Sequence, residues 1–309
     1  NITSPTTYTV TVTSNGCTGT GTHSVTIQTC NSNIEFSGKI LWEHDDVTGV
    51  KDATVSLTGS ATGSVVTNVN GDFLITTGLS NGSFTLKPTK TINKLNGVTA
   101  ADITAIQQHV ANTVLITDNY KKVCADVNKS NSITSLDASI INQSLLGNPT
   151  ALGQFKTSWR FVPSSYPMPN PPWGFPEERI YTAISAPQTN QDFIGMKTGD
   201  VTGDAAPANF GPGNSLIINV QDQILQSGTD LLAEFSADQL DDLAAFQLAL
   251  HFEPAQLQLT AIDPADGSAL PLTIDNFGLY NIDEGEIRAV WSQPTGLPVG
   301  EAAPLFRLH

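Results

Sequence analysis

The sequence predicts a mainly β, multidomain chain: an array of small β-sandwiches with one small α-helical module. Three observations predict it. Much of the chain consists of short stretches in which apolar and polar residues alternate, separated by turns rich in Gly, Asn and Ser. Apolar residues take helical spacing within residues 91–148. With 309 residues, the chain is long enough for two to four domains of ordinary size.

The charge and the apolar content exclude some classes of protein. The chain has 14 basic and 29 acidic residues, a net charge of −15, so its surface would repel the phosphates of nucleic acid. Residues 214–309 hold 14 acidic and 2 basic residues, a net charge of −12 that could attract divalent cations. No apolar run approaches the roughly 20 residues of a membrane span. We therefore expect neither a nucleic-acid partner nor a membrane span. The first residues, "NITSPTTYTVTVTSNG", already indicate strand and turn, so we expect a mature product or fragment without its targeting segment.

Residues 1–30 are predicted to form one terminal β-hairpin of an incomplete Ig-like sandwich. Tyr8, Val10 and Val12 alternate before a Ser-Asn-Gly turn, and a second alternating stretch follows. A lone hairpin is marginal in water, so the rest of its sheet must come from elsewhere. Cys17 lies near the tip and Cys30 at the open end, so a bridge between them is out of reach in a flat hairpin.

Residues 31–90 are predicted to form a small β-sandwich. The predicted strands are Lys39–Trp42, Thr54–Leu57, Ser64–Thr67, Phe73–Thr76 and Ser83–Leu86. The pattern around "GVKDATV", "NGDF" and "GSFTL" resembles carboxypeptidase-regulatory-like domains, which are prealbumin-like sandwiches of bacterial surface proteins. The resemblance implies a spacer rather than a catalytic unit.

Residues 91–148 change to helical spacing. Ile103, Ile106 and Val110 fit one helix, and Leu136, Ile140 and Leu145 fit another; these are the six residues that carry the pattern. Asp102 and Asp137 each directly precede a helix. Their simplest role is capping, because a carboxylate there accepts backbone hydrogen bonds and suits the helix dipole.

Oxygen-bearing side chains fall at regular positions before the second helix. Calcium takes six to eight oxygen ligands, and a twelve-residue loop supplies them at positions 1, 3, 5, 7, 9 and 12. Those positions are held by Asp126, Asn128, Ser130, Ser132, Thr134 and Asp137. Asn131 at position 6 tolerates the left-handed conformation that the turn requires, and Ile133 at position 8 is expected to pack inward. The loop therefore predicts a Ca²⁺ site.

This loop, with its position-12 Asp and a helix on one side, resembles one half of a dockerin module. Dockerins have two such halves, and the first would be "TINKLNGVTAADITAIQQHV". Val98, Thr99 and Asp102 match positions 8, 9 and 12, but Thr91 and Leu95 stand where strong ligands are expected. Two interpretations stay open. Either Asn93, Asn96 and backbone oxygens complete a second calcium site, or this half holds no metal.

Residues 149–213 are rich in proline and aromatic residues. Proline interrupts regular ladders, and the aromatics favour a packed connector over a free linker. Within it, "GDVTGD" places Asp200, Thr202 and Asp204 at positions 1, 3 and 5 of a calcium loop. No apolar position 8 and no position-12 carboxylate follow, so a plain turn is favoured, with a calcium role for Asp200 and Asp204 as the alternative.

Residues 214–309 return to alternating strands. The stretches "LAAFQLALHFEPAQLQLTAI" and "EGEIRAVWS" resemble strands of cohesins, and the chain stops inside what would be an incomplete cohesin-like sandwich. The block from residue 95 to residue 204 also resembles secreted multidomain proteins of gliding Gram-negative bacteria, including ones exported by type IX secretion. The usual carboxy-terminal sorting domain is not part of the sequence.

These features predict a function without catalysis. None of the five histidines has a partner at catalytic or metal spacing, so we expect no enzyme. We predict a calcium-stabilised subunit of an extracellular fibre or filament. It would assemble with itself, head to tail, by strand complementation or by cohesin/dockerin-like contacts with other surface proteins. The alternative is a cell-surface adhesin or a cohesin/dockerin scaffold that binds glycans or partner proteins.

Overall fold

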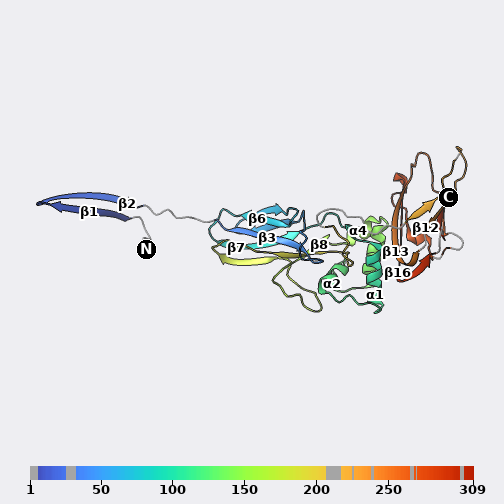
Figure 1. The fold of residues 1–309 in the computed structure, drawn as a ribbon, viewed down its shortest axis with the longest axis horizontal. Coiled ribbons are helices and arrows are strands. Elements are labelled where there is room, and N and C mark those ends of the chain that lie inside the picture. The colour runs from blue at the N-terminus through green and yellow to red at the C-terminus, as the bar shows by residue number, and fades with distance from the viewer. Residues whose placement is uncertain are drawn as a thin grey trace.

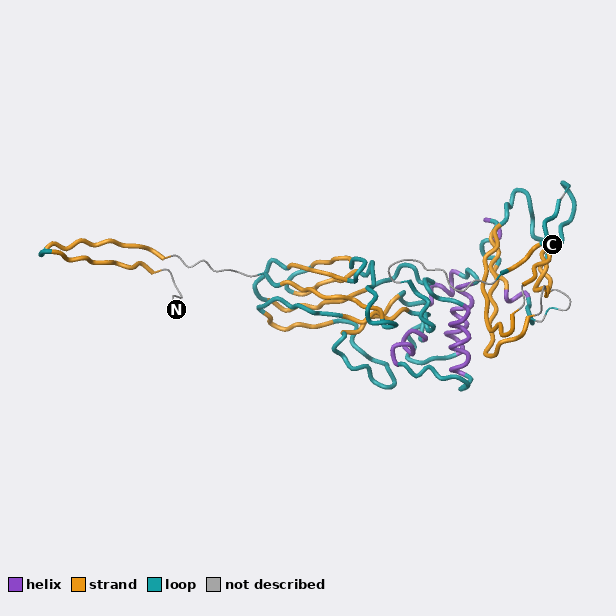
Figure 2. Tube along the Cα trace, in the orientation of Figure 1, coloured by secondary structure: helices purple, strands orange, loops and turns teal. Residues whose placement is uncertain are grey.

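The computed structural model describes residues 6–25, 33–206, 217–224, 226–237, 240–264, 268, 270–299 and 303–309. The protein is mainly β, with 39% strand and 15% helix, as the sequence predicts. Along the long axis, a hairpin is followed by a first group of sheets, a helical segment and a second group of sheets (Figure 1). Figure 2 shows the helices gathered between the two groups of sheets. No described helix is long and apolar enough to cross a membrane.

The predicted hairpin consists of β1 (Thr6–Ser14) and β2 (Cys17–Val25). Its turn is Asn15-Gly16, and both residues have positive φ, as a tight two-residue hairpin turn requires. The hairpin forms a separate two-stranded sheet and lies apart from the other sheets (Figure 1). Cys17 is a free, exposed thiol. The prediction about its pairing with Cys30 is not tested, because Cys30 lies outside the described residues.

The five strands predicted within residues 31–90 are all present, most of them longer than predicted. They are β3 (Glu35–Trp42), β4 (Thr54–Gly59), β5 (Gly63–Val66), β6 (Asp72–Thr76) and β7 (Gly82–Thr89). Inward residues such as Phe36, Leu57 and Leu86 are buried in one core. Gly71 is required at its turn, because φ is +77° and a Cβ there would lie 2.2 Å from the Ile40 carbonyl oxygen.

The prediction for residues 149–213 is wrong in one respect, because this segment contains strands. The expected absence of ladders is wrong for β8 (Trp159–Pro163), β9 (Arg179–Ile184) and β10 (Phe193–Lys197). These strands extend the two sheets of the first sandwich to the orders β6-β3-β10-β8 and β5-β4-β7-β9, with β10 parallel to β3. The expected packing is confirmed, since Trp159 and Phe161 are buried in the same core as Phe36.

The helical segment contains the two predicted helices and two others. They are α1 (Ala100–Val110), α2 (Asn119–Ala125), α3 (Ser135–Leu145) and α4 (Pro149–Gln154). Ile103, Ile106 and Ile140 are buried between the helices, as predicted. Val110 and Leu136 are instead 40% and 53% exposed, so the buried stripe is narrower than the spacing suggested.

The second sandwich has two sheets. One has the order β11-β12-β17-β14 and the other β13-β16-β15. Their bounds are β11 (Ile218–Val220), β12 (Ala233–Ala237), β13 (Leu240–His251), β14 (Ile262–Pro264), β15 (Phe277–Gly278), β16 (Glu286–Val299) and β17 (Ala303–Leu308). Two short 3-10 turns, Ile274–Asn276 and Ile282–Glu284, flank β15. Phe235, Phe246, Trp291 and Phe306 are buried in its core.

Candidate metal centre in the helical segment

The predicted twelve-residue loop connects α2 to α3. Asp126, its first residue, is the C-cap of α2 and is fully buried. One carboxylate oxygen, Oδ1, accepts the Ser130 amide at 2.8 Å, and Oδ2 accepts the Asn131 amide at 2.9 Å. Asn131 has φ +63°, the left-handed conformation predicted for position 6. The Asp126 carboxylate therefore stabilises the turn of the loop by accepting two of its backbone amides.

Asp137 closes the same loop at position 12. Its Oδ1 accepts the Val127 amide at 3.2 Å, and its Oδ2 accepts the Thr134 amide at 2.9 Å. The N-cap of α3 is Thr134, so the prediction that Asp137 directly precedes the helix is wrong: Asp137 lies inside the first turn. It still contributes to capping, because it forms a capping box with Thr134. Burial raises the pKa of Asp137, opposed by its hydrogen bonds to Thr134. A nearby cation would offset that cost of burial.

The remaining side chains of the loop are also oxygen donors. Asn128 Oδ1 accepts the Ser130 amide at 2.9 Å, and the hydroxyl oxygens of Ser130 and Ser132 lie 2.9 Å apart. Carboxylate, amide and hydroxyl oxygens are the hard donors that calcium prefers, so this set fits calcium rather than zinc. No three Asp, Glu, His or Cys side chains within the described part of the chain group as a metal cluster. Hydroxyl, amide and backbone oxygens would have to complete the coordination.

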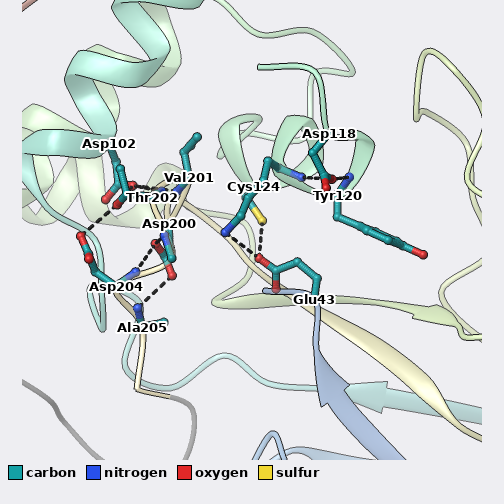
Figure 3. Close-up of polar contacts among 12 residues, drawn as sticks. Glu43, Asp102, Asp118, Tyr120, Cys124, Asp200, Val201, Thr202, Asp204 and Ala205 are labelled. Carbon is teal, nitrogen blue, oxygen red and sulfur yellow. Dashed lines mark hydrogen bonds and ion pairs between the residues drawn. The ribbon is translucent and has the colours of Figure 1, made fainter. Parts of the chain in front are cut away.

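The first predicted half has Asp102 as its position-12 residue. Asp102 is fully buried at the start of α1, where it forms a capping box with Thr99. Its Oδ2 accepts the Thr99 amide at 2.8 Å. Its Oδ1 accepts the amides of Val201 and Thr202 at 2.7 and 2.8 Å, from a segment far along the chain (Figure 3). Burial first, and then the nearby Asp200 charge, raise the pKa of Asp102 to about 6.

The segment that reaches Asp102 is "GDVTGD", which follows β10. Asp200 is fully buried, and its carboxylate accepts the amides of Gly203, Asp204 and Ala205 at 2.6, 2.9 and 2.9 Å. The exposed Asp204 accepts the Thr202 hydroxyl at 2.9 Å. The segment forms a turn, as predicted. It also places Asp200 and Asp204 beside Asp102, although these residues belong to two separate candidate loops in the sequence.

The two asparagines proposed for the first half both form hydrogen bonds, Asn96 through its side chain and Asn93 through its backbone carbonyl. Asn96 donates to the Ala206 carbonyl at 3.0 Å, and its own Oδ1 accepts the Ala206 amide at 3.4 Å. The Asn93 carbonyl oxygen accepts the Ser158 hydroxyl at 3.3 Å. Asn96 therefore anchors the end of the "GDVTGD" segment, and its amide oxygen is already engaged.

Sequence inspection missed a buried cluster beside this site. The Glu43 side chain, at the end of β3, is 1% exposed and lies 3.2 Å from the Lys121 ammonium on α2. Cys124 Sγ donates to the same Glu43 oxygen at 3.5 Å (Figure 3). Burial raises the pKa of Glu43 to about 7, although Lys121 opposes the shift. The cluster joins the first sandwich to the helical segment, and no local motif marks it.

A second buried charge lies at the same joint. Lys197, the last residue of β10, is fully buried. Its ammonium donates to the carbonyl oxygens of Lys94 and Thr198 at 2.6 and 2.8 Å. Burial lowers the pKa of Lys197 to about 8, partly offset by the negative charge of Asp200. The ammonium thus binds backbone oxygens of the joint.

Comparison with known families bears on this part of the chain. The family model described as Dockerin type I domain matches residues 92–146. No curated protein matches the chain. The match spans both predicted halves, from before α1 to the end of α3, and confirms the dockerin resemblance for this segment. Dockerin domains typically bind calcium and cohesins, so the match indicates a scaffold or surface module.

Proposed function

We propose that the chain is an extracellular structural protein, a calcium-stabilised subunit of a surface fibre that assembles head to tail. Dockerin proteins are typically extracellular or at the cell surface. The observation that carries the proposal is a contact within the chain: the dockerin-like helices pack against the second sandwich. A helix pair held in this way acts as a joint between two rigid sandwiches.

The contact joins α1 and α3 to the sheet of β13 and β16. The Ala100 amide donates to Gln247 Oε1 at 3.1 Å, and Gln108 Nε2 donates to the Pro294 carbonyl oxygen at 2.6 Å. Val290 of β16 is buried in the apolar cluster of the helices. At Gly278, a Cβ would lie 2.0 Å from the Leu146 carbonyl oxygen, so the backbones meet closely. This surface is therefore covered within the chain, which favours a structural role over recruitment of a separate partner.

The hairpin supports assembly between chains. Tyr8, Val10 and Val12 alternate along β1 and are exposed, which leaves an apolar stripe on one face of a two-stranded sheet. Unpaired strand edges favour pairing with another chain. A long edge is also present in the second sandwich, where β13 pairs with β16 alone among the described strands. Addition of the hairpin to such an edge on the next subunit is a heterologous contact, which builds filaments when it does not close into a ring.

Light scattering in calcium tests the assembly. The chain 1–309 is expected to form oligomers that grow with concentration, and a chain lacking residues 1–29 is expected to stay monomeric. Val10→Asp places a charge on the apolar stripe and should also give monomers. Thr11→Asp, on the opposite face of the same strand, is the matched control and should assemble. Monomers for the wild-type chain at all concentrations would disprove the fibre.

The dockerin match also favours a second candidate, a scaffold or adhesin that binds a partner protein or a glycan. The two functions differ in what the wild-type chain binds. A scaffold should bind a purified type I cohesin module in calcium, measured by calorimetry, and should stay monomeric alone. A fibre subunit should bind itself and leave the cohesin unbound.

We also propose that the chain is not an enzyme. His44 stacks on Trp42 with ring centroids 4.7 Å apart, and the His109 Nδ1 accepts the Ile116 amide at 3.0 Å, so both imidazoles have structural partners. This proposal would be wrong if the purified chain hydrolysed polysaccharides and lost that activity when a pair of its acidic residues was substituted.

A further inference from the structure

We propose that the chain holds a second calcium site, formed by a loop in two pieces: Asp200, Thr202 and Asp204 supply positions 1, 3 and 5, and Thr99 and Asp102 supply positions 9 and 12. We call it the split loop. It extends the calcium role proposed above to residues outside the matched dockerin segment, and it is tested separately from that role.

Each piece supplies what the other lacks. The segment before α1 has an apolar residue at position 8, a Thr at position 9 and an Asp at position 12, but no ligands at positions 1 and 5. The segment after β10 has oxygen donors at positions 1, 3 and 5, but neither an apolar position 8 nor a position-12 carboxylate. The hydrogen bonds from Val201 and Thr202 to Asp102 join them across 99 and 100 positions of sequence.

The contiguous loop, Asp126–Asp137, serves as an internal reference for this geometry. Its position-1 Asp accepts the amides of positions 5 and 6; Asp200 likewise accepts the amides of Asp204 and Ala205. Its position-12 Asp accepts the amides of positions 2 and 9; Asp102 likewise accepts those of Val201 and Thr99. The distances in the split loop are 2.9, 2.9, 2.7 and 2.8 Å, against 2.8, 2.9, 3.2 and 2.9 Å in the contiguous loop, so three pairs agree within 0.1 Å and the bond to position 2 is 0.5 Å shorter in the split loop.

The backbone passes between the two pieces where side chains would not fit. A Cβ on Gly97 would lie 2.3 Å from the Cα of Ala205, so the pieces meet at positions 6 and 7 of the loop. Gly203, at position 4, has φ +91°, and Lys129 at position 4 of the contiguous loop has φ +58°. Gly203 therefore gives position 4 the same left-handed conformation in both loops, and Gly97 permits the close approach of the two segments. Position 6 differs, because Asn131 has φ +63° and Ala205 is not left-handed.

The buried carboxylates of the split loop are balanced only in part by cationic side chains of the protein. Asp102 and Asp200 are both fully buried, and neither forms an ion pair among the described residues. The buried ammonium of Lys197 interacts electrostatically with both carboxylates, but it donates its hydrogen bonds to two carbonyl oxygens. Two buried carboxylates that lack a direct ion pair are unfavourable, and a bound Ca²⁺ would offset the part of that cost that the Lys197 charge leaves. The three carboxylates do not group around one point in the described part of the chain, so the exposed Asp204 and the Thr202 hydroxyl would have to move inward to complete the donor set on the open side.

Calcium stoichiometry tests the split loop. Isothermal calorimetry of the full chain is expected to show two Ca²⁺ for the wild type. One should remain after Asp126→Ala with Asp137→Ala, and one after Asp200→Asn with Asp204→Asn. The control is Asp275→Asn with Asp283→Asn, two exposed acids of the second sandwich, which should keep both sites. Asp204→Asn alone changes only an exposed side chain, so it should fold and still weaken one site by at least about tenfold.

The outcomes separate this inference from the proposed function. Wild-type stoichiometry in the Asp200→Asn, Asp204→Asn variant would overturn the split loop and leave the contiguous site intact. A wild type that binds no calcium would overturn both. Hydrogen exchange gives a second measurement. In the Asp126→Ala, Asp137→Ala variant, added calcium should still protect the amides of residues 98–102 and 200–205 together, and absence of that joint protection would contradict the split loop.

Discussion

Glu43 is the residue whose protonation should be visible in the stability of the protein. It faces Lys121 and Cys124 on α2 and the charge of Asp200, and burial raises its pKa from 4.5 to about 7. Between these two values the folded chain keeps a proton that the unfolded chain releases. Stability should therefore fall as the pH rises from about 4.5 to about 7, by roughly 3 kcal/mol, and the loss should level off above that window.

Urea unfolding at saturating calcium across this pH range measures the effect. Glu43→Gln removes the titration and should flatten the profile relative to wild type. Glu35→Gln, at an exposed position at the start of β3, is the control and should leave the slope unchanged. A wild-type profile parallel to that of Glu43→Gln would show that Glu43 is already ionised throughout.

Substitution of Thr134 distinguishes the contribution of the helix cap to stability from the contribution of the metal. Its hydroxyl accepts the Leu136 amide at 3.3 Å and completes the capping box of α3 without any metal. Thr134→Ala should cost about 1 kcal/mol of unfolding free energy even in chelator. Ser139→Ala, on an exposed position of the same helix, should change stability little. A loss that appears only in calcium would mean that Thr134 acts through the metal alone.

At the scale of elements, calcium is expected to hold the helical segment. The loop between α2 and α3 fixes the start of α3 through Asp137, and a ligand that binds only the folded state raises its stability. Chelator should therefore lower the melting temperature and reduce the helical signal in circular dichroism while the strand signal persists. Asp126→Ala with Asp137→Ala should keep only the calcium response that the split loop supplies.

If the wild-type melting curve is the same in calcium and in chelator, calcium has no structural role in this chain. The variant Asp275→Asn with Asp283→Asn controls for the loss of two negative charges, since both side chains are exposed.

Elements with local patterns were predictable from the sequence. The hairpin, the five strands of residues 31–90 and helices α1 and α3 follow from alternation, turn residues and apolar spacing. Helices α2 and α4 are short, with 7 and 6 residues, and carry too few apolar positions to show a period. Strands β8–β10 lie among prolines, and the parallel pairing of β10 with β3 leaves no signal in either segment.

The candidate site was predictable only where it is contiguous. The oxygen spacing from Asp126 to Asp137 is visible in twelve consecutive residues. The approach of Asp200 to Asp102 depends on where β10 leaves the first sandwich, and no local spacing encodes that. The one available signal was that the segment before α1 and the segment after β10 are both incomplete calcium motifs, and each lacks the positions that the other supplies.

The whole molecule depends on the joint between the helices and the second sandwich. Gly278→Val would force a side chain against the Leu146 carbonyl, so the sandwich should detach and the radius of gyration from small-angle scattering should rise. Gly153→Val, where a Cβ meets nothing within 4 Å, is the matched control. Unchanged emission from the buried Trp291, measured with the other three tryptophans replaced by Phe, would show that the sandwich itself stays folded. An unchanged radius of gyration for Gly278→Val would mean that this joint does not hold the sandwich in place.

The hydrogen bonds between Asp102 and the segment after β10 limit how the dockerin-like segment can be inherited by, or moved into, another protein. Residues 92–146 look like a portable cassette in sequence, yet Asp102 takes three of its hydrogen bonds from Val201 and Thr202, beyond the end of that cassette. A recombination event that moved the cassette alone would leave a buried carboxylate stripped of those donors. The unit that can be exchanged as a whole therefore includes β10 and the residues that follow it, and with them the first sandwich to which β10 belongs.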